Sequence, residues 1–326
     1  MPTSIPNYLD ASSQLLYAAA IERGITCETF PETQVIKMSY QGKSWYTAGS
    51  RTSFQSAIGQ TIADNKALTK VFLKTAQAPT AESVLVTDEN QLMELKKLHF
   101  PLVMKPQRGA HGVGVIVGLA DFAAARTAFL NQTNPVIFEE LLQGTEFRIV
   151  CINFKFAAAA LRQPAQVTGD GQHTIAELIE LKNQHPWRDE GHRGKLSLIK
   201  IDEILIQNLA QQQLVLTSRP AEKQVVILRQ TANLSTGGEA WDLTDQVSPV
   251  NQRLFETIAQ TCDLNVIGID VMCQNLTDPI AHQPKAGIIE INKSPGLRMH
   301  HFPVQGRTHD LAGQIIDFAI KEAIKL

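Results

Sequence analysis

Two short, almost fully apolar segments near the end of the chain place the strongest constraint on its fold. Residues 266–273 read VIGIDVMC, and residues 287–296 read GIIEINKSPG. Side chains alternate between the two faces of a strand, so Asp270 points away from Ile269 and Val271. A carboxylate inside such an apolar strand is costly unless it has a partner. The pattern therefore predicts two strands whose apolar faces enter the core and whose polar side chains have a specific use.

The same alternation groups the polar side chains of the second segment. Glu290 and Asn292 share one face of the strand, and Ile289 and Ile291 share the other. If the two strands are neighbours, Asp270, Glu290 and Asn292 converge as three oxygen ligands. Mg²⁺ binds through few carboxylates and completes its shell with phosphates and water, and Mn²⁺ is the alternative ion. The competing interpretation is a surface strand with ordinary polar alternation.

Strand-like and helix-like segments alternate along the rest of the 326 residues. The strand-like segments are Val35–Tyr40, Ser44–Thr47, Leu102–Lys105, Val113–Val117, Val136–Glu139, Phe147–Ile152, Lys155–Leu161, Val266–Cys273 and Ala286–Ile291. The helix-like segments are Ala67–Ala76, Glu89–Leu98, Leu119–Leu130, Thr174–Asn183, Asp202–Gln211 and Asp310–Ile324, after a first helix that Ser12-Ser13 caps and that runs through Ile21. This alternation predicts an α+β or α/β architecture, and the length suits two or three modules.

A glycine-rich turn follows the apolar strand that ends at Lys105, in the sequence LVMKPQRGAHGVGVIV. Gly109, Gly112 and Gly114 let the backbone turn tightly and present N–H groups to an anion. No Gly-Lys-Ser/Thr follows, so the loop is not a Walker A motif. The turn precedes a strand, which predicts a β-hairpin, and a plain β-turn would have the same composition.

A third segment, VIFEELLQGTEFRIV, combines an apolar strand with carboxylates. Glu146 and Arg148 share one face of its second strand. A purine needs an apolar slot with backbone hydrogen-bonding groups, and a ribose needs a carboxylate acceptor, so this segment could supply both. A solvated edge with an Arg–Glu pair is the alternative.

A fourth segment, ILRQTANLSTGGEAWDLTD, is dense in hydroxyl and amide side chains. Arg229 leaves an apolar strand there and could donate to phosphate or carboxylate oxygens. Arg162 and Arg298 are further cations near predicted strand ends, although each alone would pass for a surface arginine. The polar stretch from Asn183 to Lys195 is too long for a tight turn, and loops of that length are usually functional or disordered.

Charge and cysteine usage exclude several classes of partner. The net charge is −2 with scattered basic residues, which argues against a nucleic-acid or anionic-membrane partner. The four cysteines form no CxxC pair and are interpreted as free thiols, and no apolar run is long enough to span a membrane. We therefore expect a soluble cytoplasmic protein without covalent catalysis by its own side chains.

Taken in order, the segments resemble the ATP-grasp superfamily, and more closely the ligase modules of cyanophycin synthetase and of the bifunctional glutathione synthetases. The resemblance spans roughly residues 64 to 306. It is carried by DNKALTK, VMKPQRGAHGVGV, FEELLQGTEFR, PAQVTGDGQHTIAELIELKN, LRQTANLSTGGEAWDLTD, GIDV and EINKSPGLRMHHFP. Lys293 departs from those relatives, in which small or aromatic residues are usual at that position.

The resemblance implies an ATP-grasp fold of the α+β class, in which two α+β subdomains clasp ATP beside a small N-terminal module. The implied modules are residues 1–66, residues 67–142 with the glycine-rich lid, and residues 143–326 with the Mg²⁺ site and the substrate loops. The implied ATP contacts are Lys70 and Lys105 to the phosphates, Gly109, Gly112 and Gly114 over them, Glu139, Glu140, Leu141 and Leu142 as the adenine hinge, and Glu146 at the ribose. The implied catalytic residues are Arg162, Arg229, Asn233 and Arg298, beside Asp270, Glu290 and Asn292 at the metal.

The implied activity is ADP-forming ligation of a carboxylate to an amine through an acyl-phosphate, with ATP and Mg²⁺. The substrates would be an amino acid together with another amino acid or a small peptide. Dimers are common in the superfamily, so the resemblance leaves a homodimer open without fixing the oligomeric state. Two alternatives stay open at this stage. One is a carboxylate kinase, and the other is a non-catalytic nucleotide-binding or regulatory module.

Overall fold

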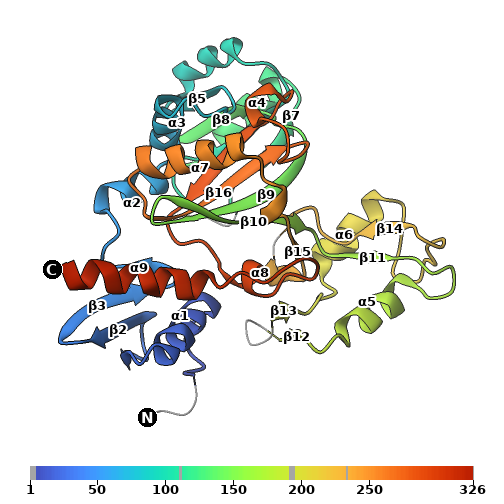
Figure 1. The fold of residues 1–326 in the computed structure, drawn as a ribbon. Coiled ribbons are helices and arrows are strands. Elements are labelled where there is room, and N and C mark those ends of the chain that lie inside the picture. Colours follow the sequence, from blue (N-terminus) through green and yellow to red (C-terminus); the bar gives the residue numbers. More distant parts are fainter. Residues whose placement is uncertain (1–4, 110–111, 191–194, 233, 326) are drawn as a thin grey trace. The chain divides into compact units, whose positions relative to one another are not determined.

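A computed structural model describes residues 5–109, 112–190, 195–232 and 234–325 (Figure 1). The chain forms two compact units, and each is assembled from separated stretches of sequence. Unit 1 comprises Met1–Thr52, Ala158–Thr244 and Gly296–Leu326, and unit 2 comprises Ser53–Ala157 and Asp245–Pro295. The three consecutive modules expected from the sequence remain a prediction. Strands and helices alternate through both units, and the α+β class is confirmed.

Unit 2 contains a four-stranded antiparallel sheet of order β5-β8-β6-β7. Its strands are β5 (Ser83–Val86), β6 (Leu102–Pro106), β7 (Ile116–Leu119) and β8 (Val136–Glu140). The 3-10 helix η1 (Glu89–Lys97) and helix α4 (Phe122–Leu130) pack on it around Leu92, Leu95, Met104, Ala125 and Phe138. The predicted hairpin is confirmed, because β6 and β7 are antiparallel neighbours. Strand β7 begins at Ile116 rather than Val113, since Gly112 and Gly114 have φ of 73° and belong to the turn.

A second antiparallel sheet in unit 2 holds the two apolar strands that the sequence singles out. Strand β16 (Val266–Cys273) lies between β9 (Thr145–Ile152) and β17 (Gly287–Asn292). Helix α7 (Pro249–Thr261) packs on β9 and β16, and helix α3 (Lys66–Thr75) contacts α7 and β17. The core side chains of β16 are fully buried, as their apolar character predicts.

The start of α3 is fixed by a local cap that positions two lysines. Asn65 closes the preceding helix α2 (Ala57–Asp64) and caps α3 through its side chain, which accepts a hydrogen bond from the Leu68 N–H at 3.1 Å. Residues four apart lie on the same helix face. Lys66 and Lys70 therefore project from one side of α3.

Unit 1 has an N-terminal layer and a central substructure. The layer consists of α1 (Ala11–Glu22), the antiparallel sheet β1 (Thr26–Thr29), β2 (Val35–Tyr40), β3 (Lys43–Ala48) and β4 (Arg51–Thr52), and the last helix α9 (Leu311–Lys325). Helix α9 packs against α1 and β3. The cap of α1 is Asp10, which accepts a hydrogen bond from Ser13 N–H at 2.8 Å. The predicted Ser12-Ser13 cap is wrong because Ser13 lies inside the helix.

The central substructure of unit 1 carries most of the segments typical of the expected branch. It contains β11 (Gln166–Thr168), α5 (Ile175–Asn183), β12 (Arg188–Asp189), β13 (Leu196–Ser197), α6 (Glu203–Gln211), β14 (Val225–Ile227), η2 (Leu234–Thr236), β15 (Glu239–Asp242) and α8 (Arg298–His301). Strand β10 (Lys155–Gln163) starts in unit 2, and its last residues pair with β15 in unit 1. Two short 3-10 turns, η3 (Thr244–Gln246) and η4 (Ile280–His282), complete the chain. Among the residues described, no helix is both long and apolar enough to cross a membrane.

Candidate active site

Neighbouring strands β16 and β17 bring the three predicted metal ligands together. Asp270 lies directly opposite Glu290 in the antiparallel register. The Asn292 amide donates to Asp270 Oδ2 at 3.2 Å. Burial, followed by the charge of Asp270, raises the pKa of Glu290. Two carboxylates and an amide oxygen thus share one place, while no group of three His, Cys, Asp or Glu side chains suited to a metal occurs among the described residues.

A β-bulge beside this pair changes one expected orientation. Asp270 pairs with Glu290, but Val271 pairs with Ile288, so Ile289 is the extra residue on β17. Ile289 is only half-buried and lines a cavity together with Glu290. The prediction that Ile289 faces the core is wrong, because the bulge interrupts the two-residue alternation on which it rested.

Arg148 holds Asp270 from the opposite neighbouring strand. The two residues face each other across β9 and β16. Arg148 Nη2 donates to Asp270 Oδ2 at 2.9 Å, and Arg148 Nε donates to Oδ1. Burial opposes the charge of Arg148, but Asp270 and then Glu290 hold the pKa of the guanidinium above its usual value. The sequence placed Arg148 beside Glu146 and missed this role, since the register of β9 against β16 is a long-range property.

Two lysines from different elements meet at one buried glutamate. Lys105 Nζ lies 2.8 Å from Glu139 Oε2, and Lys70 Nζ lies 3.3 Å from Oε1. Lys70 also donates to Thr80 Oγ1 at 2.7 Å. Burial lowers the pKa of Lys70 to about 8, and the nearby Lys105 acts in the same direction against Glu139. Burial alone would raise the pKa of Glu139, yet the two ammonium groups bring it below its usual value. Glu139 therefore lies against the predicted phosphate-binding lysines.

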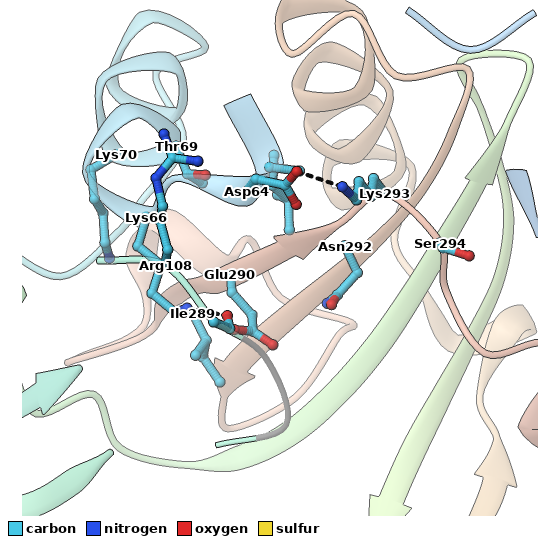
Figure 2. Close-up of a pocket in the computed structure, with 13 residues that line it drawn as sticks. Asp64, Lys66, Thr69, Lys70, Arg108, Ile289, Glu290, Asn292, Lys293 and Ser294 are labelled. Atoms are coloured by element: carbon cyan, nitrogen blue, oxygen red, sulfur yellow. Dashed lines mark hydrogen bonds and ion pairs between the residues drawn. The ribbon is translucent and has the colours of Figure 1, made fainter. Parts of the chain in front are cut away.

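A cavity of about 420 Å³ in unit 2 collects several of these groups (Figure 2). It is lined by Ala63, Asp64, Lys66, Thr69, Lys70, Arg108, Gly109, Ile289, Glu290, Ile291, Asn292, Lys293 and Ser294. Figure 2 shows Glu290 and Asn292 on one strand and, by a dashed line, the ion pair between Lys293 and Asp64, which measures 2.5 Å. The cavity therefore joins cationic side chains to the carboxylate–amide cluster, an arrangement that can hold a polyanion together with a divalent cation.

Lys66 and Arg108 line this cavity but were not predicted as site residues, and neither was Lys293, which the sequence marked only as a departure from the relatives. Lys66 Nζ donates to the carbonyl of Gly109 at 2.8 Å, which connects the first turn of α3 to the glycine-rich turn. Burial lowers the pKa of Lys66. Arg108 lines the same cavity. The spacing of Lys66 and Lys70 on one helix face was the available signal for the former, whereas Arg108 has no periodic pattern that marks it.

Three glycines of the glycine-rich turn have the backbone conformation that the sequence predicts for them. Gly109 has φ of 126°, and Gly112 and Gly114 each have 73°, in the region that other residues rarely adopt. A Cβ on Gly114 would lie 2.8 Å from Pro106 Cγ. The turn therefore depends on glycine both for its dihedral angles and for space.

The predicted adenine hinge and ribose residues lie at the end of β8 and the start of β9. Glu140 accepts hydrogen bonds from the backbone N–H of His99 at 2.9 Å and from its ring nitrogen at 2.8 Å. Leu141 and Leu142 are half-buried, and Glu146 is half-buried opposite Met272. None of these four residues lines the 420 Å³ cavity, and their nucleotide contacts remain predictions.

The predicted catalytic arginines lie in unit 1. Arg162 Nε donates to the Ala232 carbonyl at 3.1 Å. Arg229 forms an ion pair with Asp202 at 2.6 Å, and Arg298 donates to Ser197 Oγ at 3.1 Å. Arg229 and Arg298 are buried rather than superficial. Asn233 lies outside the described residues, and the roles of all four remain predictions.

Comparisons with known proteins agree on the fold. No family model matches the chain. The cyanophycin synthetase of Crocosphaera subtropica is 33% identical over 316 residues, which are 95% of this chain and 36% of that protein. The glutathione biosynthesis bifunctional protein of Mannheimia succiniciproducens is 32% identical over 327 residues, 97% of this chain and 43% of that protein.

Solved structures give the same result. The bifunctional glutathione synthetase from Pasteurella multocida matches with a TM-score of 0.76 and 30% identity over 96% of this chain and 44% of that one. The D-alanine–D-alanine ligase from Bacillus anthracis matches with a TM-score of 0.50 and 14% identity, over 83% of this chain and 70% of that one, which bears on the fold alone. The chain spans less than half the length of the curated relatives it matches.

Proposed function

Since this chain is an ATP-grasp protein homologous to cyanophycin synthetases and to bifunctional glutathione synthetases, we propose that it is an ATP-dependent, ADP-forming ligase that joins a carboxylate to an amine. The observation that supports this most is the convergence of Asp270, Glu290 and Asn292 beside a cavity that Lys66, Lys70 and Arg108 also line. Oxygen ligands next to cations suit a triphosphate with its divalent cation.

The donor set fits Mg²⁺, with Mn²⁺ as the alternative ion. Asp270 and Glu290 would provide carboxylate oxygens, and the Asn292 amide would provide a neutral one. Bound there, the ion would neutralise charge on the phosphate oxygens. Arg148 would keep Asp270 oriented through its two hydrogen bonds.

The proposed reaction has two steps. A carboxylate oxygen of the first substrate attacks the γ-phosphorus, the bond to the ADP oxygen breaks, and an acyl-phosphate forms. The amine nitrogen of the second substrate then attacks the acyl carbon, and inorganic phosphate leaves with one oxygen of the original carboxylate. Lys70 and Lys105 would stabilise the charge that develops on the transferred phosphoryl group. The glycine-rich turn from Gly109 to Gly114 would cover it and exclude water.

The remaining roles follow the resemblance. Residues 139–142 would provide the adenine hinge, and Glu146 would hold the ribose. Arg162, Arg229, Asn233 and Arg298 would bind the acyl-phosphate or a substrate carboxylate. The substrates would be an amino acid and a second amino acid or small peptide, as the names of the relatives suggest.

Location and assembly complete the proposal. All four cysteines are free thiols, and three of them are buried, which suits a reducing compartment such as the cytoplasm. The resemblance leaves a homodimer open, and analytical ultracentrifugation tests it directly.

A substrate screen tests the activity. The protein is incubated with ATP, Mg²⁺ and a library of amino acids and dipeptides, while ADP release and product masses are followed. ADP release that requires a carboxylate and an amine together, with a product of the condensed mass, supports the proposal. ADP release with the carboxylate alone would indicate a kinase instead, and ATP binding without any turnover would indicate a nucleotide-binding module.

A further inference from the structure

A second cavity, of about 500 Å³, lies within unit 1 at the end of helix α5. It is lined by Leu181, Lys182, Gln184, His185, Arg188, Leu196, Glu239 and Val304. Its volume falls in the range of small-molecule pockets, roughly 300–1,000 Å³. Three of its lining residues, Gln184, His185 and Arg188, belong to the long polar stretch for which the sequence offered no specific role.

One carboxylate, that of Glu239, organises the charged wall of this cavity. Its Oε1 accepts from Arg188 Nη2 at 2.5 Å and from Lys182 Nζ at 2.9 Å. The Glu239 side chain is only 12% exposed. Within the described part of the chain, Oε2 accepts no hydrogen bond. Oε2 is therefore available to a donor from a ligand in the cavity that Glu239 lines.

Arg188 is fixed by the fold and serves as a support for Glu239. Its side chain is 1% exposed. Its Nη1 donates to the carbonyls of Ser197 at 2.5 Å and Gly237 at 3.2 Å. The guanidinium therefore orients Glu239 Oε1 and leaves Oε2 for other partners.

Two hydrogen-bond donors are left on the same wall. The ammonium of Lys182 has three N–H bonds, and it uses two of them, towards the Gln166 carbonyl at 3.0 Å and Glu239. His185 Nδ1 accepts from the Trp187 backbone N–H at 3.2 Å, so the proton of the neutral ring lies on Nε2. One N–H of Lys182 and the Nε2–H of His185 can therefore donate to a ligand.

We propose that this cavity binds the free α-ammonium and α-carboxylate of an amino-acid substrate. Glu239 Oε2 receives the ammonium, while Lys182 and His185 donate to the carboxylate. This inference rests on the proposed function only in naming the cavity as the place of one reactant. A simple anion would meet the open oxygen of Glu239, and a simple amine would meet Lys182 and Arg188, so a zwitterion is the ligand that satisfies both signs of charge.

The apolar part of the wall receives the rest of the ligand. Leu181, Leu196 and Val304 line the cavity beside the charged cluster. A triphosphate fits this wall poorly, because one lysine and one arginine face it together with a carboxylate. The structure thus assigns this cavity to an amino acid or the end of a short peptide.

Binding measured by calorimetry tests the assignment without any turnover. The full chain is titrated with each of the L-α-amino acids, with and without a non-hydrolysable ATP analogue, and then with the des-amino acid and the amide of each one that binds. We expect at least one amino acid to bind. Loss of its ammonium or its carboxylate charge should lower the affinity by about ten-fold or more, because each group forms charge-assisted hydrogen bonds in the cavity. Absence of binding by all of them, or equal binding of the des-amino acid, overturns the proposal.

Matched lysine variants localise the binding. Lys182→Met should weaken binding of the amino acid by about ten-fold or more. Lys223→Met should leave this affinity unchanged, because the Lys223 side chain is 89% exposed and lies outside the cavity. Both variants should bind ATP like the wild type. Equal amino-acid affinity in the two lysine variants contradicts the assignment.

A measurement on the wild type alone does not depend on the folding of any variant. The exposed His185 should react with diethylpyrocarbonate and be protected by the bound amino acid, whereas His99, 91% exposed in unit 2, should not be protected. Equal modification of His185 with and without the amino acid refutes the site. Either negative result leaves the ligase screen intact, so failure of this inference and failure of the proposed activity remain distinguishable.

Discussion

Asp270 and Glu290 lie directly opposite each other on β16 and β17, in a sheet whose apolar face is buried. Arg148 holds Asp270 from one side, and the Asn292 amide bonds to it from the other. Two neighbouring carboxylates repel each other, and burial adds to the cost. A divalent cation would relieve both effects, which is the role that the proposed function gives to this pair.

The first prediction concerns metal affinity. Glu290→Gln should weaken Mn²⁺ binding by more than about ten-fold. Substitution of residues that only support metal ligands already lowers metal affinity by about ten-fold or more, and loss of a ligand should cost at least as much. Glu256→Gln is the control, because Glu256 pairs with Lys155 outside the cavity. Electron paramagnetic resonance of free Mn²⁺ measures both affinities. Because the pKa of Glu290 is raised, Glu290 becomes protonated at a higher pH than an ordinary glutamate. The Mn²⁺ affinity of the wild type should therefore begin to fall at a correspondingly higher pH as the solution is acidified. Unchanged affinity in Glu290→Gln would remove the metal assignment.

The second prediction concerns stability and uses two Lys–Glu pairs of equal length. Lys105–Glu139 and Lys74–Glu82 both measure 2.8 Å, but the glutamate side chains are 4% and 62% exposed. Glu139→Gln leaves two buried lysines without a counter-charge and should lower the free energy of unfolding by roughly 3–5 kcal/mol. Glu82→Gln should cost less than about 1 kcal/mol. Urea denaturation compares them, and equal losses would show that burial is not decisive at Glu139.

The third prediction follows from the pKa of Lys70, which burial lowers to about 8. Above pH 8 the free protein holds this amine largely neutral, and ATP phosphates should restore its charge. ATP binding near pH 9 should therefore take up as much as one proton, and ATP affinity should fall as pH rises through about 8. Calorimetry in buffers of different ionisation enthalpy counts the protons.

Matched variants identify the group that is responsible for this uptake. Lys70→Met should abolish it, whereas Lys74→Met, four residues along α3 and 53% exposed, should retain it. The lowered pKa of Lys70 also makes the stability of the fold depend on pH. Between pH 8 and the ordinary value of 10.5 the folded state binds fewer protons than the unfolded state, so stability contributed by Lys70 rises with pH. Proton uptake that persists in Lys70→Met would contradict this explanation.

Elements with a strong local pattern could be predicted from the sequence, and pairings between distant elements could not. Strands β2 and β16 have the predicted bounds, and the Asp270–Glu290 pairing required only that two apolar strands be neighbours. The β-bulge at Ile289 has no residue type that marks it. The Arg148–Asp270 contact depends on the register between two strands, and the two residues are 122 positions apart in the sequence.

The composition of the two compact units also depends on contacts between distant parts of the chain, which the sequence alone does not reveal. Each unit combines stretches that are far apart in the sequence, and a linear pass along the chain divides it only into consecutive modules. Lys70 and Lys105 were expected at the phosphates from the family resemblance, and the structure places both against Glu139. The sequence did not single out Arg108 or the Glu239 cluster, because only the fold shows which side chains surround a cavity.

The fourth prediction concerns the close packing beside the proposed metal ligands. A Cβ on Gly268 would lie 2.8 Å from Pro295 Cβ, 3.4 Å from Asn292 Cβ and 3.5 Å from Arg148 Cδ. Gly268→Ala should therefore displace β17, weaken Mn²⁺ binding and cost about 1–3 kcal/mol of stability. Gly296→Ala is the control, because a Cβ there meets nothing within 4 Å. Similar stability and metal affinity in both variants would show that β17 can shift without consequence.

Transfer of oxygen from the substrate carboxylate to phosphate tests the central claim most directly. Once the screen has identified a substrate pair, the carboxylate is labelled with ¹⁸O, and the phosphate released during a complete turnover is analysed by mass spectrometry. An acyl-phosphate route places one labelled oxygen in each inorganic phosphate and none in ADP. Unlabelled phosphate, or label recovered in AMP, would show that the carboxylate is not activated by the γ-phosphoryl group.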